Sequence, residues 1–260
     1  MIRAIGVIVP AHNEQDLLPS CLASLRRAAR ALRGVPVHLV VVADACHDRT
    51  AQVARRGGAS VVRISANSAG LARAAGARAI LGRSRHLRPA DLWLATTDAD
   101  TLVPARWLRQ QARYASQGWD AIVGTIQVAD WSGRAPGTRS MFRERYGSGT
   151  GQHGHVHGAN LGFRASAYLT AGGFPALPSG EDHALVAALA ATGSRILRTR
   201  ALPVTTSARL EARAPHGFGD YLGRLDTAAV TPRPEAAPAP ASEAACEPAP
   251  LPAAMSSPGG

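Results

Sequence analysis

The N-terminal segment IGVIVPAHNEQDLLPSCLASL, residues 5–25, places a strand directly before a helix. Its first five residues form a continuous apolar run that Pro10 ends, which is typical of a strand covered on both faces. Apolar side chains then recur at helical spacing as far as Leu32, and Gly34 and Pro36 stop the helix. The segment therefore predicts the first strand and the first helix of an α/β domain.

The same alternation of strand and helix continues to about residue 120. Further strands are predicted at 37–42, 59–64 and 91–97, and further helices at 49–56, at 69–82 and after Pro104. Strands that alternate with helices favour right-handed β-α-β crossovers. We therefore predict an α/β fold with a doubly wound, mostly parallel sheet of the Rossmann type.

The pattern changes in the second half of the chain. We expect strands at 121–128, 195–197 and 202–206, helices at 180–192 and 217–226, and an irregular, glycine-rich stretch over 129–157. From Thr231 the chain consists mainly of Pro, Ala, Ser and Glu, which cannot bury enough apolar surface to offset the entropy of ordering. We therefore expect one domain over 1–230, followed by a disordered Pro/Ala-rich tail over 231–260.

The composition is that of a soluble globular protein. The 260 residues are 46% hydrophobic, no apolar stretch approaches the ~20 residues that span a bilayer, and the first apolar run is too short for a secretory signal. The three cysteines have no CxxC spacing, which argues against a disulfide framework or a zinc site. We expect a cytoplasmic protein with no transmembrane segment.

The net charge of +11 is carried entirely by arginine and lies mostly in the first third of the chain. Such an excess suits a phosphate-bearing small ligand, nucleic acid or an anionic lipid, or is simply a solvated surface. Aromatic residues make up only 5% of the chain and do not interleave with the arginines, so a platform that stacks single-stranded bases is poorly supported. We expect no nucleic-acid partner.

Polar residues follow three of the predicted strands at their carboxyl ends, where ligands bind in open α/β sheets. They are the segment Pro10-Ala11-His12-Asn13-Glu14, the residue Asp44, and the segment Asp98-Ala99-Asp100. One acid at a strand end is often only a helix cap, but acids at three strand ends favour a shared site. Two carboxylates two residues apart offer hard oxygen ligands to Mg²⁺ or Mn²⁺, although Asp98 capping a turn beside a solvated Asp100 is the simpler alternative.

Several segments together resemble the family 2 glycosyltransferases of the GT-A fold. They are IVPAHNEQDLLPSCLASL, VVVADACHDRTAQVA, NSAGLARAAGARA, DADT, HGANLGFRASAYLTAGGFP and GEDHALVAALAATG, in the family's order over about 4–230. The resemblance implies a nucleotide-binding half over 1–118 and a smaller acceptor-side half over 119–230. It also implies metal-dependent, inverting transfer of a sugar from a UDP- or GDP-linked donor to an unidentified acceptor hydroxyl.

The resemblance also implies a role for each matching residue. Asp100 would be the main metal ligand, and Asp182 the catalytic base. The nucleotide-sugar would contact Pro10, Ala11, Asn13, Glu14, Asp44, Arg73, Asp98 and Ala99, and the acceptor and sugar pocket would include His157, Gly158, Asn160 and Glu181. The chain departs from the family pattern at Ala43, Ala74, Ala184 and Ala188, and it has no QxxRW segment, which argues against a processive synthase.

Other interpretations stay open at this point. A nucleotidyltransferase would need a glycine-rich phosphate loop with a basic residue after the first strand, and PAHNE has neither. If the domain is a non-enzymatic module that binds a nucleotide or nucleic acid, Asp100 and Asp182 are dispensable. In the alternative interpretation of Glu181 and Asp182, these acids have no catalytic role and only stabilise the N-terminus of a helix. Minor alternatives are a metal triad of His153, His155 and His157, a further metal ligand at His216, and a sugar-stacking role for Trp131.

Overall fold

The computed structural model describes residues 1–147, 153–209 and 218–230. Within these ranges seven strands form one sheet in the order β3-β2-β1-β4-β6-β5-β7. The strands are β1 Ala4–Ala11, β2 Val37–Asp44, β3 Ser60–Ile64, β4 Leu92–Thr96, β5 Ala121–Val128, β6 Leu161–Arg164 and β7 Ile196–Thr206. The helices are α1 Leu18–Ala31, α2 Thr50–Arg56, α3 Ala69–Arg83, α4 Trp107–Ser116, α5 Thr138–Tyr146, α6 Ala165–Thr170, α7 Glu181–Ala191 and α8 Phe218–Val230, with 3₁₀ turns η1 Pro89–Asp91 and η2 Gly158–Asn160.

The sheet is mostly parallel, as the sequence predicts. Strand β1 pairs in parallel with β2 and β4, and β2 pairs in parallel with β3. The short strand β6 is antiparallel to both of its neighbours, β4 and β5, while β5 and β7 are again parallel. Strand β6 therefore separates a parallel N-terminal part of the sheet from the β5–β7 pair.

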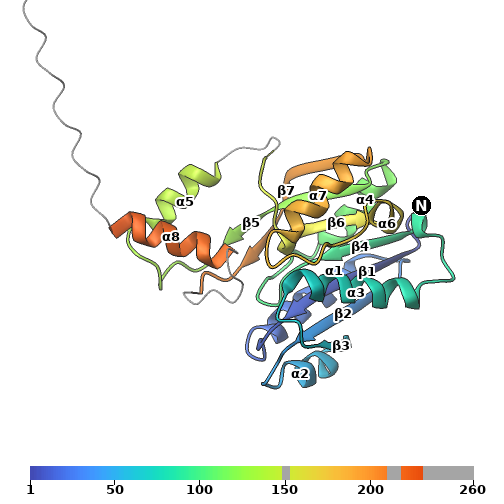
Figure 1. The fold of residues 1–260 in the computed structure, drawn as a ribbon, viewed down its shortest axis with the longest axis horizontal. Coiled ribbons are helices and arrows are strands. Elements are labelled where there is room, and N and C mark those ends of the chain that lie inside the picture. The colour runs from blue at the N-terminus through green and yellow to red at the C-terminus, as the bar shows by residue number, and fades with distance from the viewer. Residues whose placement is uncertain (148–152, 210–217, 231–260) are drawn as a thin grey trace, which may run out of the picture.

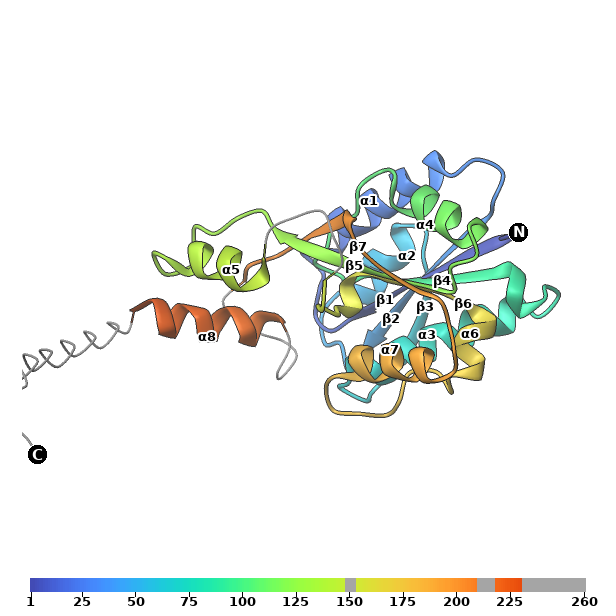
Figure 2. The same cartoon turned by 90° about the horizontal axis from the view of Figure 1, so that it is seen from above.

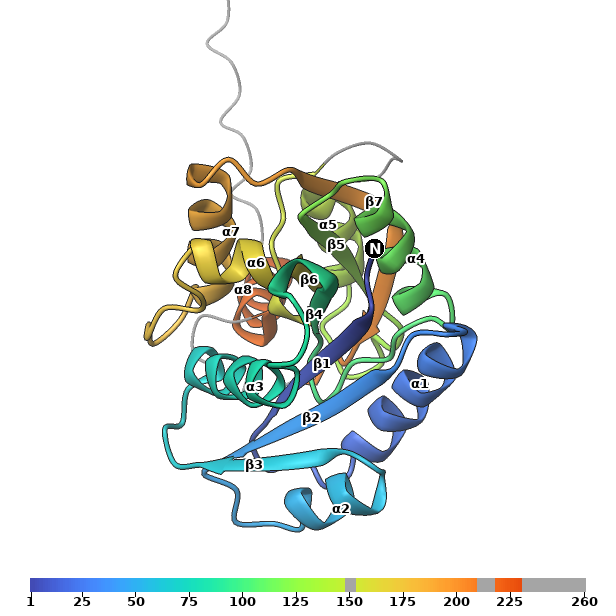
Figure 3. The ribbon, with the colours of Figure 1, turned by 90° about the vertical axis from the view of Figure 1, so that its right-hand side faces the viewer.

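Helices cover both faces of the sheet, which makes it doubly wound (Figures 2 and 3). One apolar cluster joins one face of the sheet to α1, α2 and α4, and includes the fully buried Trp93 and Trp107. The second cluster joins the opposite face to α3, α6 and α7. Because both faces are buried, β1 needs apolar residues at successive positions, which explains the uninterrupted run from Ile5 to Val9.

Helices α5 and α8 lie together beyond the ends of β5 and β7, away from the rest of the sheet (Figures 1 and 2). Aromatic contacts join them, since the ring centroid of Phe142 lies 5.9 Å from that of Phe218 and 6.5 Å from that of Tyr221. The prediction that 129–157 is irregular throughout is therefore wrong for α5. The helix buries its aromatic face against a partner helix about 80 residues later, which local periodicity does not show.

Two further predictions differ from the structure. The short strands expected at 195–197 and 202–206 belong to one strand, β7, whose pairing with β5 is interrupted by a register shift between Gly124 and Ile126. Strand β6 and helix α6 were not predicted, because they have only four and six residues. The tail expected at 231–260 lies outside the described residues. No helix in the described part of the chain is both long and apolar enough to cross a bilayer.

Candidate active site

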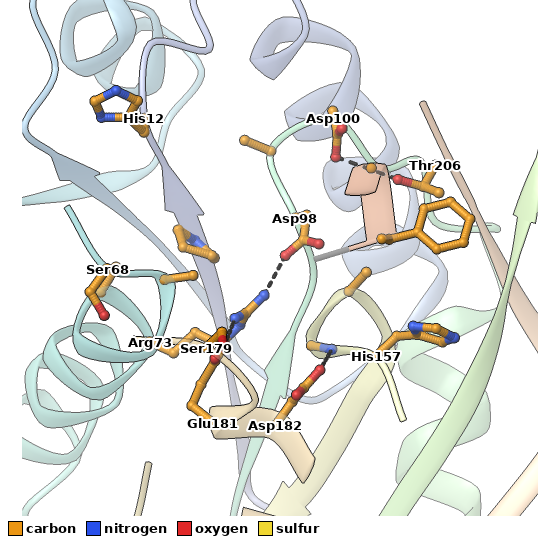
Figure 4. Close-up of a pocket in the computed structure, with 18 of the residues that line it drawn as sticks. His12, Ser68, Arg73, Asp98, Asp100, His157, Ser179, Glu181, Asp182 and Thr206 are labelled. Atoms are coloured by element: carbon orange, nitrogen blue, oxygen red, sulfur yellow. Dashed lines mark hydrogen bonds and ion pairs between the residues drawn. The ribbon is translucent and has the colours of Figure 1, made fainter. Parts of the chain in front are cut away.

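A cavity of about 760 Å³ opens at the carboxyl ends of β1, β2 and β4. Its other walls come from the N-termini of α3 and α7, from η2 and from the start of α8. The predicted site residues that line it are Pro10, Ala11, Glu14, Asp44, Arg73, Asp98, Ala99, Asp100, His157, Gly158, Glu181 and Asp182. Segments separated by up to 172 positions in the sequence therefore converge on one cavity (Figure 4).

Asp44 fixes the loop that leads into α3. One carboxylate oxygen accepts hydrogen bonds from the backbone N–H groups of Ala66 (2.7 Å) and Asn67 (2.9 Å), and the other accepts one from Ser68 (2.7 Å). Ser68 in turn caps α3 by accepting a hydrogen bond from the N–H of Leu71. Since a carboxylate has about four acceptor positions, Asp44 can still accept one more hydrogen bond from a ligand in the cavity.

Arg73 connects three elements beneath the cavity. Its guanidinium, which is almost fully buried, donates to Oδ1 of Asp98 at 2.6 Å and also to Oε1 of Glu181. Burial alone would lower the pKa of Arg73, but the neighbouring carboxylates Asp98, Glu181 and Asp182 outweigh it and raise that pKa. Gly158 packs so closely on the guanidinium that a Cβ there would collide with it. The N-termini of α3 and α7 and the end of β4 are thus held together by charge.

Replacing Arg73 by Met is expected to lower the free energy of unfolding by about 3–5 kcal/mol, because Glu181 would stay buried without its cation. Urea denaturation measures this difference. Arg26→Met is the matched control, since Arg26 is exposed and donates to the carbonyl oxygen of Gly57, so its removal leaves no buried carboxylate without a cation. The control should change the unfolding midpoint far less. Equal midpoint shifts in the two variants would show that Arg73 has no such role.

An acidic group in the cavity wall, at the ends of β1 and β4, consists of Glu14, Asp98 and Asp100. The guanidinium of Arg209 lies against this group. Nη2 of Arg209 lies 2.6 Å from Oδ2 of Asp100 and 2.8 Å from Oε1 of Glu14. Burial raises the pKa of Asp100 to about 6; the charge of Arg209 opposes this, while Asp98 and Glu14 raise it further. Nothing in the sequence around residue 209 distinguishes this arginine from the many others, so the sequence did not predict it.

The composition of this acidic group fits a divalent cation such as Mg²⁺ or Mn²⁺. Carboxylate oxygens are the ligands that these hard cations prefer, and a guanidinium already lies against two of the carboxylates. Within the described residues, no group of three or more His, Cys, Asp and Glu side chains is arranged to hold a metal ion. A cation at Asp100 would therefore take further ligands from water or from a bound diphosphate, which is usual for Mg²⁺.

Asp182 lies in the first turn of α7, with its carboxylate held in place on both sides. Oδ2 accepts a hydrogen bond from the N–H of Gly158 and Oδ1 accepts one from the N–H of His183, both at 2.8 Å. Its neighbour Glu181 is buried against Arg73, so the two adjacent acids have different surroundings. Figure 4 shows the carboxylate of Asp182 next to the backbone near His157.

A model of glycosyl transferase family 2 matches residues 6–170. The chain belongs to this family. Among curated relatives, an undecaprenyl-phosphate 4-deoxy-4-formamido-L-arabinose transferase of Pseudomonas paraeruginosa is 32% identical over 48% of this chain and 36% of its own length. A 4,4'-diaponeurosporenoate glycosyltransferase of Staphylococcus haemolyticus is 37% identical over 26% of this chain and 17% of its own length. The chain thus spans well under half the length of these relatives.

Solved structures show the same fold. S. aureus TarS in complex with UDP-GlcNAc has a TM-score of 0.59 at 15% identity, covering 87% of this chain and 66% of TarS. The mannosyltransferase PcManGT of Pyrobaculum calidifontis, in complex with GDP-Man and Mn²⁺, has a TM-score of 0.56 at 19% identity, covering 80% of this chain and 58% of its own. The predicted family and the predicted GT-A fold are therefore both confirmed.

Two residues that the family 2 resemblance placed in the site do not line the cavity. The side-chain amide of Asn160 donates to the carbonyl oxygens of Thr125 and Leu202, both at 2.8 Å, and its Oδ1 accepts from Nε1 of Trp107. Asn160 thus joins β5, β7 and α4 within the protein interior. Oδ1 of Asn13 accepts from the N–H of His47, which holds the loop after β1 against the loop after β2.

The three alternating histidines form a stack of rings and not a metal triad. The ring centroids of Tyr146 and His155 lie 3.9 Å apart, and the near-parallel rings of His153 and His157 have their centroids 5.9 and 6.1 Å from that of His155. Nε2 of His153 and of His155 each lie within hydrogen-bond distance of a backbone carbonyl oxygen. His157 lines the cavity, and burial lowers its pKa to about 4, so its ring is neutral at pH 7.

The remaining candidates from the sequence lie elsewhere. Trp131 contacts Phe142, with ring centroids 5.3 Å apart, and donates from Nε1 to the carbonyl oxygen of Val128. It does not line the cavity, so its predicted role in stacking on a sugar has no support within the described residues. His216 lies outside those residues.

Proposed function

We propose that this family 2 domain transfers a sugar from a UDP- or GDP-linked donor to an acceptor hydroxyl, in a metal-dependent reaction that inverts the anomeric configuration. The observation that carries the proposal is that Asp44, Asp100 and Asp182 line one cavity. The similarity to TarS bound to UDP-GlcNAc and to PcManGT bound to GDP-Man supports a nucleotide-sugar donor. The proposal includes a nucleotide-binding half over 1–118 and an acceptor-side half over 119–230.

The donor nucleotide would bind between the loop after β1 and the N-terminus of α3. Asp44 has one acceptor position left for a base N–H, and Pro10, Ala11 and Glu14 form the neighbouring wall. The diphosphate would then lie next to Asp98 and Asp100. A Mg²⁺ or Mn²⁺ ion on Asp100 would supply positive charge for the departing diphosphate.

Asp182 would act as the general base. The N–H groups of Gly158 and His183 hold its carboxylate in one orientation, so that it can accept the proton of an acceptor hydroxyl in the cavity. The neutral ring of His157 and the rings of Tyr146, Phe218 and Tyr221 line the adjoining wall, where an acceptor would lie. Attack by that hydroxyl on the face opposite to the leaving diphosphate inverts the anomeric carbon.

The nucleotidyltransferase alternative has less support. The loop that follows β1 contains Glu14 within the cavity wall and has neither the glycines nor the basic side chain of a phosphate loop. Product analysis separates the two reactions, because glycosyl transfer releases a nucleoside diphosphate whereas nucleotidyl transfer forms or consumes pyrophosphate. A non-enzymatic binding module would release neither product.

A screen of nucleotides and nucleotide-sugars by thermal shift, with and without Mn²⁺, tests the proposed donor class. A uracil or guanine nucleotide that binds the folded state should stabilise it by about 2.7 kcal/mol at a concentration one hundred times its Kd. We expect Mn²⁺ to be required for the full shift. The absence of any stabilisation by UDP, GDP or their sugars in the presence of Mn²⁺ would refute a nucleotide-sugar donor.

A further inference from the structure

Arg209 pairs with two of the carboxylates that would hold a metal ion. Its Nη2 contacts Oδ2 of Asp100 at 2.6 Å and Oε1 of Glu14 at 2.8 Å, so one nitrogen bridges two carboxylates from β1 and β4 loops. These carboxylates are themselves nearly buried, with side chains only 9% and 6% exposed. A divalent cation that binds these carboxylate oxygens comes close to the guanidinium, and the two positive charges then repel each other.

The surroundings of Arg209 leave it a second position. Arg209 and Asp100 line the main cavity and also a second cavity of about 400 Å³, which extends toward Leu102 and Asp130. The side chain of Arg209 is 26% exposed, in contrast to the buried Arg73. Its Nη1 is buried and has no hydrogen-bond acceptor among the residues that the structure describes. The side chain thus has both space to move and a donor available for a ligand anion.

We propose that Arg209 is a built-in counter-cation that neutralises Asp100 and Glu14 until a divalent metal binds, and that the displaced guanidinium then contacts the donor diphosphate. The proposal rests on the proposed function, because it needs a diphosphate next to Asp100. A planar guanidinium binds phosphate oxygens through paired hydrogen bonds, which makes Arg209 suited to this second contact. Arg209 would thus oppose the binding of metal alone and favour the binding of metal together with nucleotide.

The test measures two affinities on the full chain and its Arg209→Gln variant. Isothermal titration gives the Kd for Mn²⁺ alone, and a second titration gives the Kd for UDP or GDP at saturating Mn²⁺. We expect Arg209→Gln to bind Mn²⁺ about tenfold more tightly than the parent chain. We expect it to bind the nucleotide about tenfold more weakly, because it lacks one charge-assisted hydrogen bond to the diphosphate. These opposite changes are not expected from a general loss of structure.

Two further variants complete the experiment. Arg195→Gln removes the same charge from an exposed side chain that donates to the carbonyl oxygen of Gly118, away from the cavity, and should leave both affinities unchanged. Arg209→Lys keeps the charge and should bind Mn²⁺ as weakly as the parent chain, which keeps the test valid if the Gln variant folds poorly. Unchanged or weaker Mn²⁺ binding in Arg209→Gln, or undiminished nucleotide binding, would overturn the proposal.

The failure of the proposed function would look different. If neither UDP nor GDP binds any variant, the donor class is wrong, yet the comparison of Mn²⁺ affinities still shows whether Arg209 excludes the metal. If Mn²⁺ binds only the Arg209→Gln variant, the competition is supported in its strongest form. If Mn²⁺ binds neither chain, Asp100 is not a metal site and the proposal for Arg209 is overturned.

Discussion

Replacing Asp100 by Asn is expected to reduce metal-dependent turnover of the donor by a factor of about 10² to 10³, the size of effect seen when one group that stabilises developing charge is removed. The amide keeps the shape of the side chain and loses the anionic oxygens that the acidic group offers to a cation. The measurement is release of nucleoside diphosphate from the donor identified in the thermal-shift screen, as a function of Mn²⁺ concentration.

The same variant should be more stable than the parent chain when no metal is present. Burial raises the pKa of Asp100 to about 6, so the folded state penalises its charge. Below about pH 4 Asp100 is protonated in both the folded and the unfolded state, so its burial brings no penalty for charge. As the pH rises to about 6 and above, the free energy of unfolding of the parent chain falls by about 3 kcal/mol, whereas that of the variant with the neutral Asn does not. Urea denaturation in EDTA at pH 7.5 and at pH 4.5 should show the difference shrinking at the lower pH.

Glu144→Gln is the control for both measurements, because Glu144 is an exposed acid of α5 that lines neither cavity. It should turn over the donor at the parent rate and should show no gain in stability. Parent-like turnover by Asp100→Asn with Mn²⁺ would contradict the assignment of Asp100 as the metal ligand. A variant that is inactive but less stable in EDTA would contradict the burial argument.

The parallel half of the fold was predictable because its signals are local. Apolar runs such as Ile5 to Val9 indicate strands buried on both faces, and each is followed by a helix with its own stop signal. The elements that were missed depend on distant partners. Helix α5 gains its apolar contacts from Phe218 and Tyr221 of α8, and strand β6 is a four-residue element defined by its pairing with β4 and β5.

The acidic part of the site was predictable for a similar reason, since strand ends meet at one edge of a parallel sheet. The ion-pair partners of these acids were not predictable from the sequence. Asp98 and Glu181 carry no local signal that both pair with Arg73, and Arg209 approaches Asp100 from a loop 109 positions later in the sequence. The hydrogen bonds of Asn160 were not predictable either: this residue follows the family pattern, and its side-chain amide joins β5, β7 and α4.

Replacing Asp182 by Asn is expected to lower the rate of sugar transfer by a factor of about 10² to 10⁴, the usual contribution of a general base. Donor affinity should stay within about twofold of the parent value, because Asp182 lies on the proposed acceptor side of the cavity and Asn can still accept a hydrogen bond from the N–H of Gly158. Single-turnover transfer and donor titration, measured on the same preparation, separate the two quantities.

A second substitution tests whether the carboxylate itself is needed. Asp182→Glu keeps the charge at the N-terminus of α7 but moves the oxygens by one methylene, away from the positions that the N–H groups of Gly158 and His183 define. It should retain more transfer than Asp182→Asn, since a displaced base still accepts a proton and an amide does not. If the Asn variant transfers sugar within tenfold of the parent rate, Asp182 is only a helix-stabilising acid, and the base must be another residue of the cavity.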